Sequence, residues 1–316
     1  MLPGIALCAA VMGCAFALRA LPGLSSFSPL ILAIALGIVV RNTVGRPEAA
    51  RSGIRFSMRT LLRVAIVALG AQISLGRMAS IGLTGVAIPL GCLVATFVLT
   101  ERLAPLFGVE RGLARLIAAG TSVCGAAAVV AANDVVRSSD EDVAYAVATV
   151  TVFGSLAVFA YPLLPFGLVF APHAYGVWAG ASIHEIAQVV AAGFARGAVA
   201  GEAGIVTKLV RVMMLAPLLL VLSAGNRNAG ARPPIPWFAF GFIGMVIATS
   251  VVPLPRPLLA AVNVVDQALF AMALGAMGLE TSIVALRRKG FRPLALAAVA
   301  SLFIATVAYS LVRIAG

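Results

Sequence analysis

Long apolar runs follow one another along the whole chain, separated by short joins that carry glycine, proline and arginine. Each run is close to the roughly 20 residues that an α-helix needs to cross a bilayer. Inside lipid a chain must satisfy its own backbone hydrogen bonds, which favours helices. The pattern predicts an all-α integral membrane protein with about 10–11 transmembrane helices. Their approximate ranges are 3–21, 28–43, 60–76, 79–99, 111–133, 142–163, 173–195, 204–224, 235–253, 258–282 and 293–314.

The composition supports this class and leaves no room for a soluble domain. Hydrophobic residues make up 62% and charged residues 11% of the 316, with a mean hydropathy of +1.09. Soluble domains average roughly 45–50% and 25%. We therefore expect residues 1–316 to form a single polytopic membrane domain. The first run has no basic start and no clear cleavage site, so it is interpreted as a retained helix and not as a signal peptide.

The net charge of +12 reflects membrane topology and does not indicate nucleic-acid binding. Most arginines lie in alternate joins, and the positive-inside rule then places the N-terminus in the cytoplasm and the C-terminus outside. The acidic cluster after the fifth run is expected outside. The basic residues that set this orientation are Arg41, Arg46, Arg51, Arg55, Arg59, Arg102, Arg111, Arg227, Arg232, Arg287, Arg288, Lys289 and Arg292.

Neither cysteine nor histidine chemistry predicts an enzyme. Cys8, Cys14, Cys92 and Cys124 lie within apolar runs without CxxC spacing, as expected of small core residues. The two histidines, together with the scattered cysteines, form no metal or nucleophile set. No cofactor is expected other than a coupling Na⁺ or H⁺.

Two apolar stretches 60 residues apart resemble each other. Residues 120–133 read GTSVCGAAAVVAAN, and residues 180–193 read GASIHEIAQVVAAG. Paired glycine-interrupted hydrophobic segments are the best sequence pointer to a binding site in a secondary transporter. A second similarity joins residues 61–71 to residues 268–276, in runs expected to point in opposite directions. The 120–133 and 180–193 runs would point in the same direction, which a simple inverted repeat does not explain.

These interrupted stretches hold the first candidate ligands. A helix that breaks at Gly120 or Gly180 exposes backbone N–H and C=O groups, and Thr121, Ser122 and Ser182 add hydroxyl donors. The N-terminal end of a half-helix also suits an anion. The alternative is that small residues simply allow close helix packing.

Five polar or charged residues in apolar surroundings extend the candidate site. His184, Glu185 and Gln188 lie in the second stretch, where Glu185 could carry a proton or bind sodium. Lys208 and Arg211 share a helix face and form a candidate oxyanion site. The alternative for these two cations is that they reach to the lipid headgroups.

The run at 258–282 carries a further polar cluster. Asn263 and Asp266 are candidates for the coupling ion, since a carboxylate is costly in lipid. The alternative is a structural ion pair of Asp266 with Arg63 or Arg211.

The chain resembles the YeiH family of bacterial inner-membrane sulfate exporters along essentially its whole length. The resemblance rests on LGIVVRN (36–42), LGAQISL (69–75), GTSVCGAAA (120–128), SIHEIAQV (182–189) and KLVRVMMLAP (208–217). It implies a fold related to cation–proton antiporters and bile-acid symporters. That fold has inverted repeats, here 27–163 and 172–316, with discontinuous helices crossing near the midplane in a core domain beside a scaffold domain. Residues 1–22 would form an additional helix, and related folds often form homodimers.

The leading hypothesis is therefore an inner-membrane secondary transporter of a small anion, sulfate or an organosulfonate, that works by alternating access. Gly120, Thr121, Ser122, Ser182, His184, Gln188, Lys208 and Arg211 would bind the anion, and Glu185, Asp266 and Asn263 the coupling ion. The alternatives are an anion channel or a carrier for a carboxylate without sulfur. The expected partners are the anion and the lipid bilayer.

Overall fold

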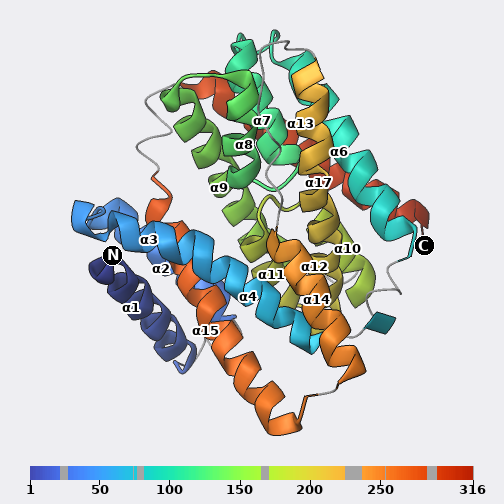
Figure 1. Ribbon diagram of the computed structural model, residues 1–316. Helices are drawn as coiled ribbons and strands as arrows, with labels where there is room; N and C mark the ends of the chain where they lie inside the picture. Colours follow the sequence, from blue (N-terminus) through green and yellow to red (C-terminus); the bar gives the residue numbers. More distant parts are fainter. Residues whose placement is uncertain are drawn as a thin grey trace. The chain divides into compact units, whose positions relative to one another are not determined.

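The structure, a computed structural model, describes residues 1–21, 28–73, 75–76, 82–164, 171–224, 237–252, 254–282 and 290–315, and these ranges contain helices and no strand (Figure 1). Six of the described helices are long and apolar enough to cross a membrane. The predicted all-α integral membrane class is confirmed, and each predicted range overlaps a helix or a pair of helices. The six are Leu2–Arg19, Thr84–Leu103, Glu141–Leu163, Ala198–Ser223, Arg256–Glu280 and Phe291–Ala315.

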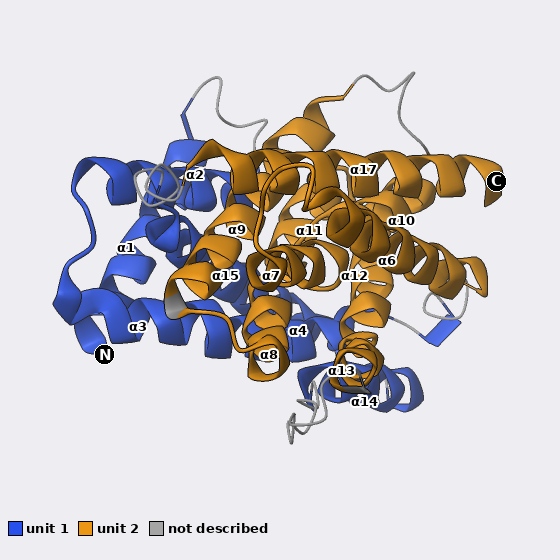
Figure 2. Cartoon of the chain, turned by 90° about the horizontal axis from the view of Figure 1, so that it is seen from above, with its two compact units in different colours: residues 1–80, 237–282 blue, residues 81–236, 283–316 orange. Residues whose placement is uncertain are grey.

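The chain divides into two compact units, which Figure 2 distinguishes by colour. Unit 1 comprises residues 1–80 and 237–282, and unit 2 comprises residues 81–236 and 283–316. Each unit takes helices from both predicted repeats, so neither repeat is a compact body by itself. The repeat relation of 27–163 to 172–316 stays a prediction.

Unit 1 is built around the close contact of α2 (Pro29–Thr43) with α15 (Arg256–Glu280). A Cβ on Gly37 would lie 2.9 Å from Cα of Gly278, so only glycine permits this approach. The unit also contains α1 (Leu2–Arg19), η1 (Glu48–Ala50), α3 (Arg51–Phe56), a π-helical turn (Ser57–Leu61), α4 (Leu62–Leu69), η3 (Gly70–Gln72) and α14 (Trp237–Val251).

The segment from α3 to η3 runs antiparallel to α15. Ile54 packs in one cluster with Ala276 and Leu279, while Gln72 at the other end bonds to Asp266. The opposite directions predicted for the similar stretches 61–71 and 268–276 are therefore confirmed.

Unit 2 contains the two interrupted stretches. Its helices are α6 (Thr84–Leu103), α7 (Arg111–Ser122), α8 (Ala126–Val136), α9 (Asp140–Leu163), α10 (Pro172–Ser182), α11 (Ile186–Phe194), α12 (Ala198–Met213), α13 (Leu215–Ala224) and α17 (Phe291–Ala315). The helix breaks lie at 123–125 and 183–185, inside the two stretches that the sequence singled out.

The first break folds α8 back along α7, and the two helices lie side by side in Figure 1. A Cβ on Gly112, near the start of α7, would lie 3.5 Å from Cβ of Ser138, which follows α8. Nearer the break, a Cβ on Gly120 would lie 2.7 Å from Cγ2 of Val129. Helices α7 and α8 thus form a hairpin, which we call hairpin 1, with its tip at residues 123–125.

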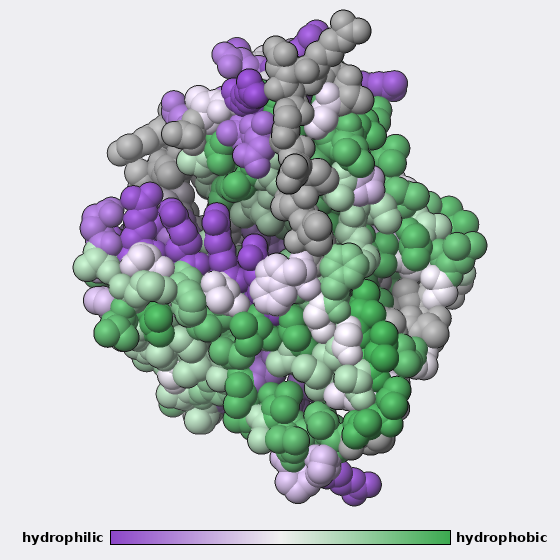
Figure 3. Space-filling view, viewed as in Figure 1, coloured by the Kyte–Doolittle hydropathy of each residue, from purple (hydrophilic) through white to green (hydrophobic). Residues whose placement is uncertain are grey.

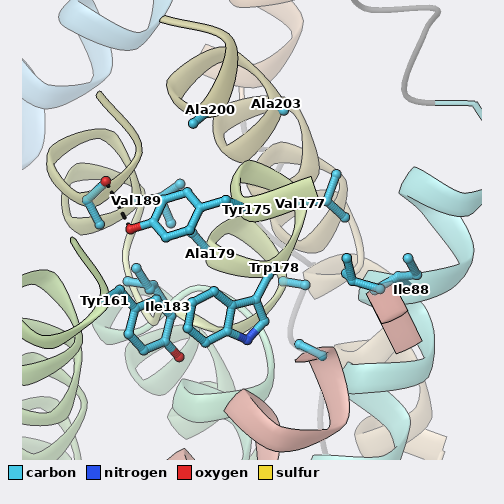
Figure 4. Close-up of a cluster of buried hydrophobic side chains, with 14 of the residues drawn as sticks. Ile88, Tyr161, Tyr175, Val177, Trp178, Ala179, Ile183, Val189, Ala200 and Ala203 are labelled. Atoms are coloured by element: carbon cyan, nitrogen blue, oxygen red, sulfur yellow. Dashed lines mark hydrogen bonds between the residues drawn. The ribbon is translucent and has the colours of Figure 1, made fainter. Parts of the chain in front are cut away.

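The second break folds α11 back along α10 in the same way. The Tyr175 hydroxyl, from the start of α10, donates to the carbonyl of Ala192 near the end of α11 at 3.2 Å, drawn as a dashed line in Figure 4. The Trp178 ring stacks on Tyr161 of α9 at 3.9 Å between centroids, and its Nε1 donates to the carbonyl of Ala305 on α17. We call α10 and α11 hairpin 2; its tip is residues 183–185.

The hairpins correct the expectation that ranges 111–133 and 173–195 continue across the membrane. Hairpin 1 opens at the N-terminal end of α9, and hairpin 2 opens at its C-terminal end, where Arg196 donates to the carbonyl of Leu164. Since α9 is long enough to cross, the two hairpins enter from opposite sides. The similar stretches 120–133 and 180–193 therefore do not cross in the same direction, because each returns to the side of the membrane from which it entered.

Side chains that face outward from the helices are largely apolar, as a lipid-facing surface requires. In the view of Figure 3 hydrophilic side chains gather over α3, and apolar ones cover much of the remaining described surface. Leu90, Val94, Leu156, Val264 and Leu302 are examples of exposed large hydrophobic residues on membrane-length helices.

Candidate functional site

The candidate site lies where the tips of the two hairpins meet beside the middle of α9. A Cβ on Gly120 of hairpin 1 would lie 2.8 Å from Cγ1 of Val150. From hairpin 2, Nε2 of Gln188 donates to the carbonyl of Thr151 at 3.2 Å. Oε1 of Glu185 accepts the N–H of Ala126 at 3.1 Å and so joins the tips directly. Four half-helix ends converge here: the C-terminal ends of α7 and α10 and the N-terminal ends of α8 and α11.

The tip of hairpin 1 depends on Gly125. Its φ of +75° and ψ of −135° are strained for a residue with a Cβ. A Cβ at this position would also lie 2.5 Å from Cγ of Glu185. Glycine therefore both turns the chain and allows the glutamate of hairpin 2 to approach.

The tip of hairpin 2 is an extended segment that ends in a capping box. Ile183 and Glu185 have extended backbones, with ψ of 145° and 150°. The Glu185 side chain accepts the backbone N–H of Gln188, and Oε1 of Gln188 accepts the backbone N–H of Glu185 at 3.1 Å. The pairing fixes the start of α11 and directs the Glu185 carboxylate toward the start of α8.

Lys208 donates to both hairpin tips. The side chain is 0% exposed on α12, and its Nζ lies 2.8 Å from the carbonyl oxygens of Val123 and Ile183. The ammonium therefore does not reach the lipid headgroups, which was the structural alternative for this residue.

Arg211 does the same with a larger set of carbonyls. It is also 0% exposed, and its guanidinium makes four hydrogen bonds. The acceptors are the carbonyls of Thr121 (2.7 Å) and Ser122 (3.2 Å) in hairpin 1, and of Gly180 (3.3 Å) and Ile183 (3.0 Å) in hairpin 2. The two cations thus neutralise the partly negative C-terminal ends of α7 and α10. Of the five N–H groups of arginine and the three of lysine, one each remains without a hydrogen bond to a described residue.

Three other buried polar atoms at the tips lack a partner among the described residues. They are Oγ1 of Thr121, Oγ of Ser122 and Nδ1 of His184. His184 is held through its other ring nitrogen, which lies 3.1 Å from Oγ of Ser301 on α17. Buried polar groups normally find partners, so an unpaired set at one place indicates a ligand or water position.

The remaining predicted anion ligands have structural partners. The Ser182 hydroxyl donates to the carbonyl of Trp178 at 2.7 Å and accepts from the Tyr161 hydroxyl at 3.0 Å. Gly120 packs against Val129 and Val150, and Gln188 completes the capping box. The small-residue packing alternative describes Gly120 and Gly180 well.

The two predicted coupling residues outside the hairpins belong to unit 1. Asp266 is buried, and its Oδ2 accepts from Nε2 of Gln72 at 3.1 Å. Within unit 1 the alternative ion pair of Asp266 with Arg63 is not formed, since the Arg63 guanidinium lies over the Phe238 ring. Asn263 is exposed and accepts from Gln267. The coupling role of Asp266 and Asn263 stays a prediction.

Sequence reasoning did not find Ser301, Thr151 or Tyr161. Each is an uncharged polar residue in a largely apolar helix, a pattern too common to indicate a site. Their roles follow from which helices pack around the hairpins, and the sequence pattern carries no signal for that.

The fold defines a class: an α-helical, multi-pass membrane protein with two hairpins whose tips meet around buried cations. Comparisons with known proteins then place the chain. A family model described as "Conserved hypothetical protein 698" matches residues 3–297. The chain is 44% identical to the UPF0324 membrane protein PA5383 of Pseudomonas aeruginosa, over 94% of this chain and 90% of that one.

The UPF0324 inner membrane proteins YeiH of Salmonella typhi and Escherichia coli K12 are 39% and 38% identical, each over 94% of this chain and 89% of theirs. The chain belongs to this YeiH, or UPF0324, family, and it is a multi-pass protein of the bacterial inner membrane. No solved structure matches it.

Proposed function

We propose that this protein is a secondary transporter of a small anion, of the sulfate or organosulfonate type, that works by alternating access and is coupled to protons or sodium. The observation that carries the proposal is the charge of the site. Lys208 and Arg211 contribute two positive charges, and Glu185 is the only acidic residue in the segments 120–126 and 180–188. The buried centre is therefore one negative charge short of balance.

The geometry supports an anion over a cation. The starts of α8 and α11 bring partly positive N-terminal ends to the same place as the two cations. The unpaired hydroxyls of Thr121 and Ser122 and the remaining N–H groups of Lys208 and Arg211 are donors that suit an oxyanion. A sodium site would instead need several oxygen acceptors, and the tip carbonyls already accept from the two cations.

Opposed hairpins also support alternating access. One hairpin enters from each side, and both tips contact the same cations, so movement of either hairpin would open the site to one side only. In secondary transporters the substrate site usually lies where discontinuous helices meet near the membrane midplane.

The test is thermal stability of the purified protein with sulfate, sulfite, thiosulfate, taurine-type sulfonates and small carboxylates, with and without sodium. A ligand that binds only the folded state, at a concentration 100 times its Kd, raises the free energy of unfolding by about 2.7 kcal/mol. We expect one class of anion to raise the melting temperature. The double variant Thr121→Val with Ser122→Ala removes two unpaired hydroxyls and should reduce that shift.

Thr149→Val is the matched control, because this buried hydroxyl donates to the carbonyl of Ala146 in its own helix. It should leave the anion-induced shift unchanged. The proposal fails if no anion stabilises the protein, or if the two variants lose the shift equally. Conductance without coupling, measured in reconstituted bilayers, would favour the channel alternative.

A further inference from the structure

The carboxylate of Glu185 occupies the place that an anion would take. It accepts N–H groups from the first turns of two half-helices, Ala126 of α8 and Gln188 of α11. The N-terminal end of a helix is a general binding site for carboxylate, sulfate and phosphate. At this centre the position is filled by a side chain of the protein itself.

A second observation, separate from the contacts of Glu185, also indicates a ligand position at this centre. The hydroxyls of Thr121 and Ser122 are 1% and 0% exposed and have no partner among the described residues. Both residues directly precede the tip that Glu185 contacts. A centre with unpaired donors beside a carboxylate that caps two helices is suited to exchange one anion for another.

We infer that Glu185 is an internal competitor of the transported anion, and that the anion binds only when Glu185 takes up a proton. The inference rests on the proposed function. With Glu185 ionised, it and the two cations sum to one positive charge; with Glu185 protonated they sum to two, which a dianion neutralises. The proton comes from the solvent on the side of anion entry and leaves Glu185 on the side of release. The coupling is therefore proton–anion symport, one proton for each anion.

Other titratable groups surround Glu185 and could in principle take the proton instead. Lys208 faces it from α12 and Cys124 from the tip of hairpin 1. His184 is adjacent in the chain, and Arg211 bonds to the carbonyl of Ile183 two residues before it. Only Glu185 combines a carboxylate with contacts to both helix starts, so the assignment is specific enough to be tested by substitution.

The experiment measures proton uptake when sulfate or methanesulfonate binds to the purified, weakly buffered protein between about pH 5 and pH 8. These anions carry no proton in that range, so any uptake belongs to the protein. We expect one proton for each sulfate bound and, where a full proton is taken up, an affinity that rises about tenfold for each unit by which the pH falls. The variant Glu185→Gln keeps an oxygen that can accept from Ala126, and it should bind sulfate without proton uptake and independently of pH.

Glu202→Gln on α12 is the matched control and should behave as the unaltered protein. Anion binding without proton uptake in the unaltered protein overturns the inference but leaves the proposed function intact. Proton uptake that persists in Glu185→Gln also overturns it and moves the proton to another group. If neither anion binds at any pH in this range, the proposed function fails for this class of anion, and the inference fails with it.

Discussion

At the residue scale, the two buried cations have a structural role that their sequence positions do not indicate. Lys208 and Arg211 were predicted as an anion site because they share a helix face without an acidic neighbour. In the structure they donate six hydrogen bonds to backbone carbonyls at the hairpin tips. Their first role is to hold the two tips together, and a substrate would meet only what remains of their charge and donors.

Replacing Arg211 should therefore unfold or loosen unit 2 as well as affect transport. We expect Arg211→Met to cost about 3–5 kcal/mol, since it leaves buried carbonyls without donors. Arg115→Met is the control, because Arg115 is exposed and pairs with the side chain of Glu101; it should cost less than about 1 kcal/mol. Thermal unfolding of the purified variants measures both. Equal melting temperatures would show that Arg211 does not hold the tips.

Gly180 has no side chain, and this allows α10 to pack closely against α12. A Cβ on Gly180 would collide with the carbonyl oxygen of Gly204 on α12. We expect Gly180→Ala to cost about 1–3 kcal/mol by forcing α10 away from α12. The control Gly13→Ala has no atom within 4 Å of its new Cβ and should be neutral or slightly stabilising. The melting temperatures of the two variants decide whether this close approach is needed.

At the element scale, the central result is that two interrupted stretches are hairpins. The sequence predicted which stretches are interrupted, but it placed the breaks at Gly120 and Gly180, which lie inside α7 and α10; the helices end at Ser122 and Ser182. It did not predict that the chain turns back, because the same residues permit a straight interrupted span. The turn depends on Gly125 in one hairpin and on the extended backbone at Ile183 and Glu185 in the other.

A disulfide tests hairpin 1 directly. In a background without the four native cysteines, Gly112→Cys with Ser138→Cys should oxidise spontaneously, since the Cβ atoms would be 3.5 Å apart, within the range for a disulfide. The pair Ser139→Cys with Leu163→Cys, at the two ends of α9, is the control and should stay reduced. Counting free thiols measures the result, and a reduced first pair would indicate a straight span.

At the scale of the whole molecule, the hairpins change which connections face the cytoplasm. The positive-inside rule still places the join that holds Arg102 and Arg111 in the cytoplasm. Because hairpin 1 returns to that side, Asp134 and the acidic residues that follow it are now expected in the cytoplasm and not outside. The join before α10 is now expected outside and not in the cytoplasm. The expected positions of both chain ends stay the same.

Labelling with an impermeant thiol reagent distinguishes the two topologies. Asp134→Cys and His173→Cys are both exposed positions, again in the cysteine-free background. We expect the first to react only from the cytoplasmic side and the second only from outside. Straight spans would give the reverse for both, so the hairpin topology fails if Asp134→Cys reacts from outside intact cells.

The sequence by itself determined the class of the protein, the approximate positions of the helices, the two stretches that are interrupted, and most of the polar residues at the tips. These follow from hydrophobic periodicity and composition, which are local properties of the chain. Only the tertiary structure decided that the breaks are turns and that Glu185 caps α8 from the other hairpin. It also decided that Asp266 bonds to Gln72 in unit 1. The reason is physical: a buried polar group takes whichever partner packing brings within hydrogen-bond distance, and that partner is often far away in the sequence.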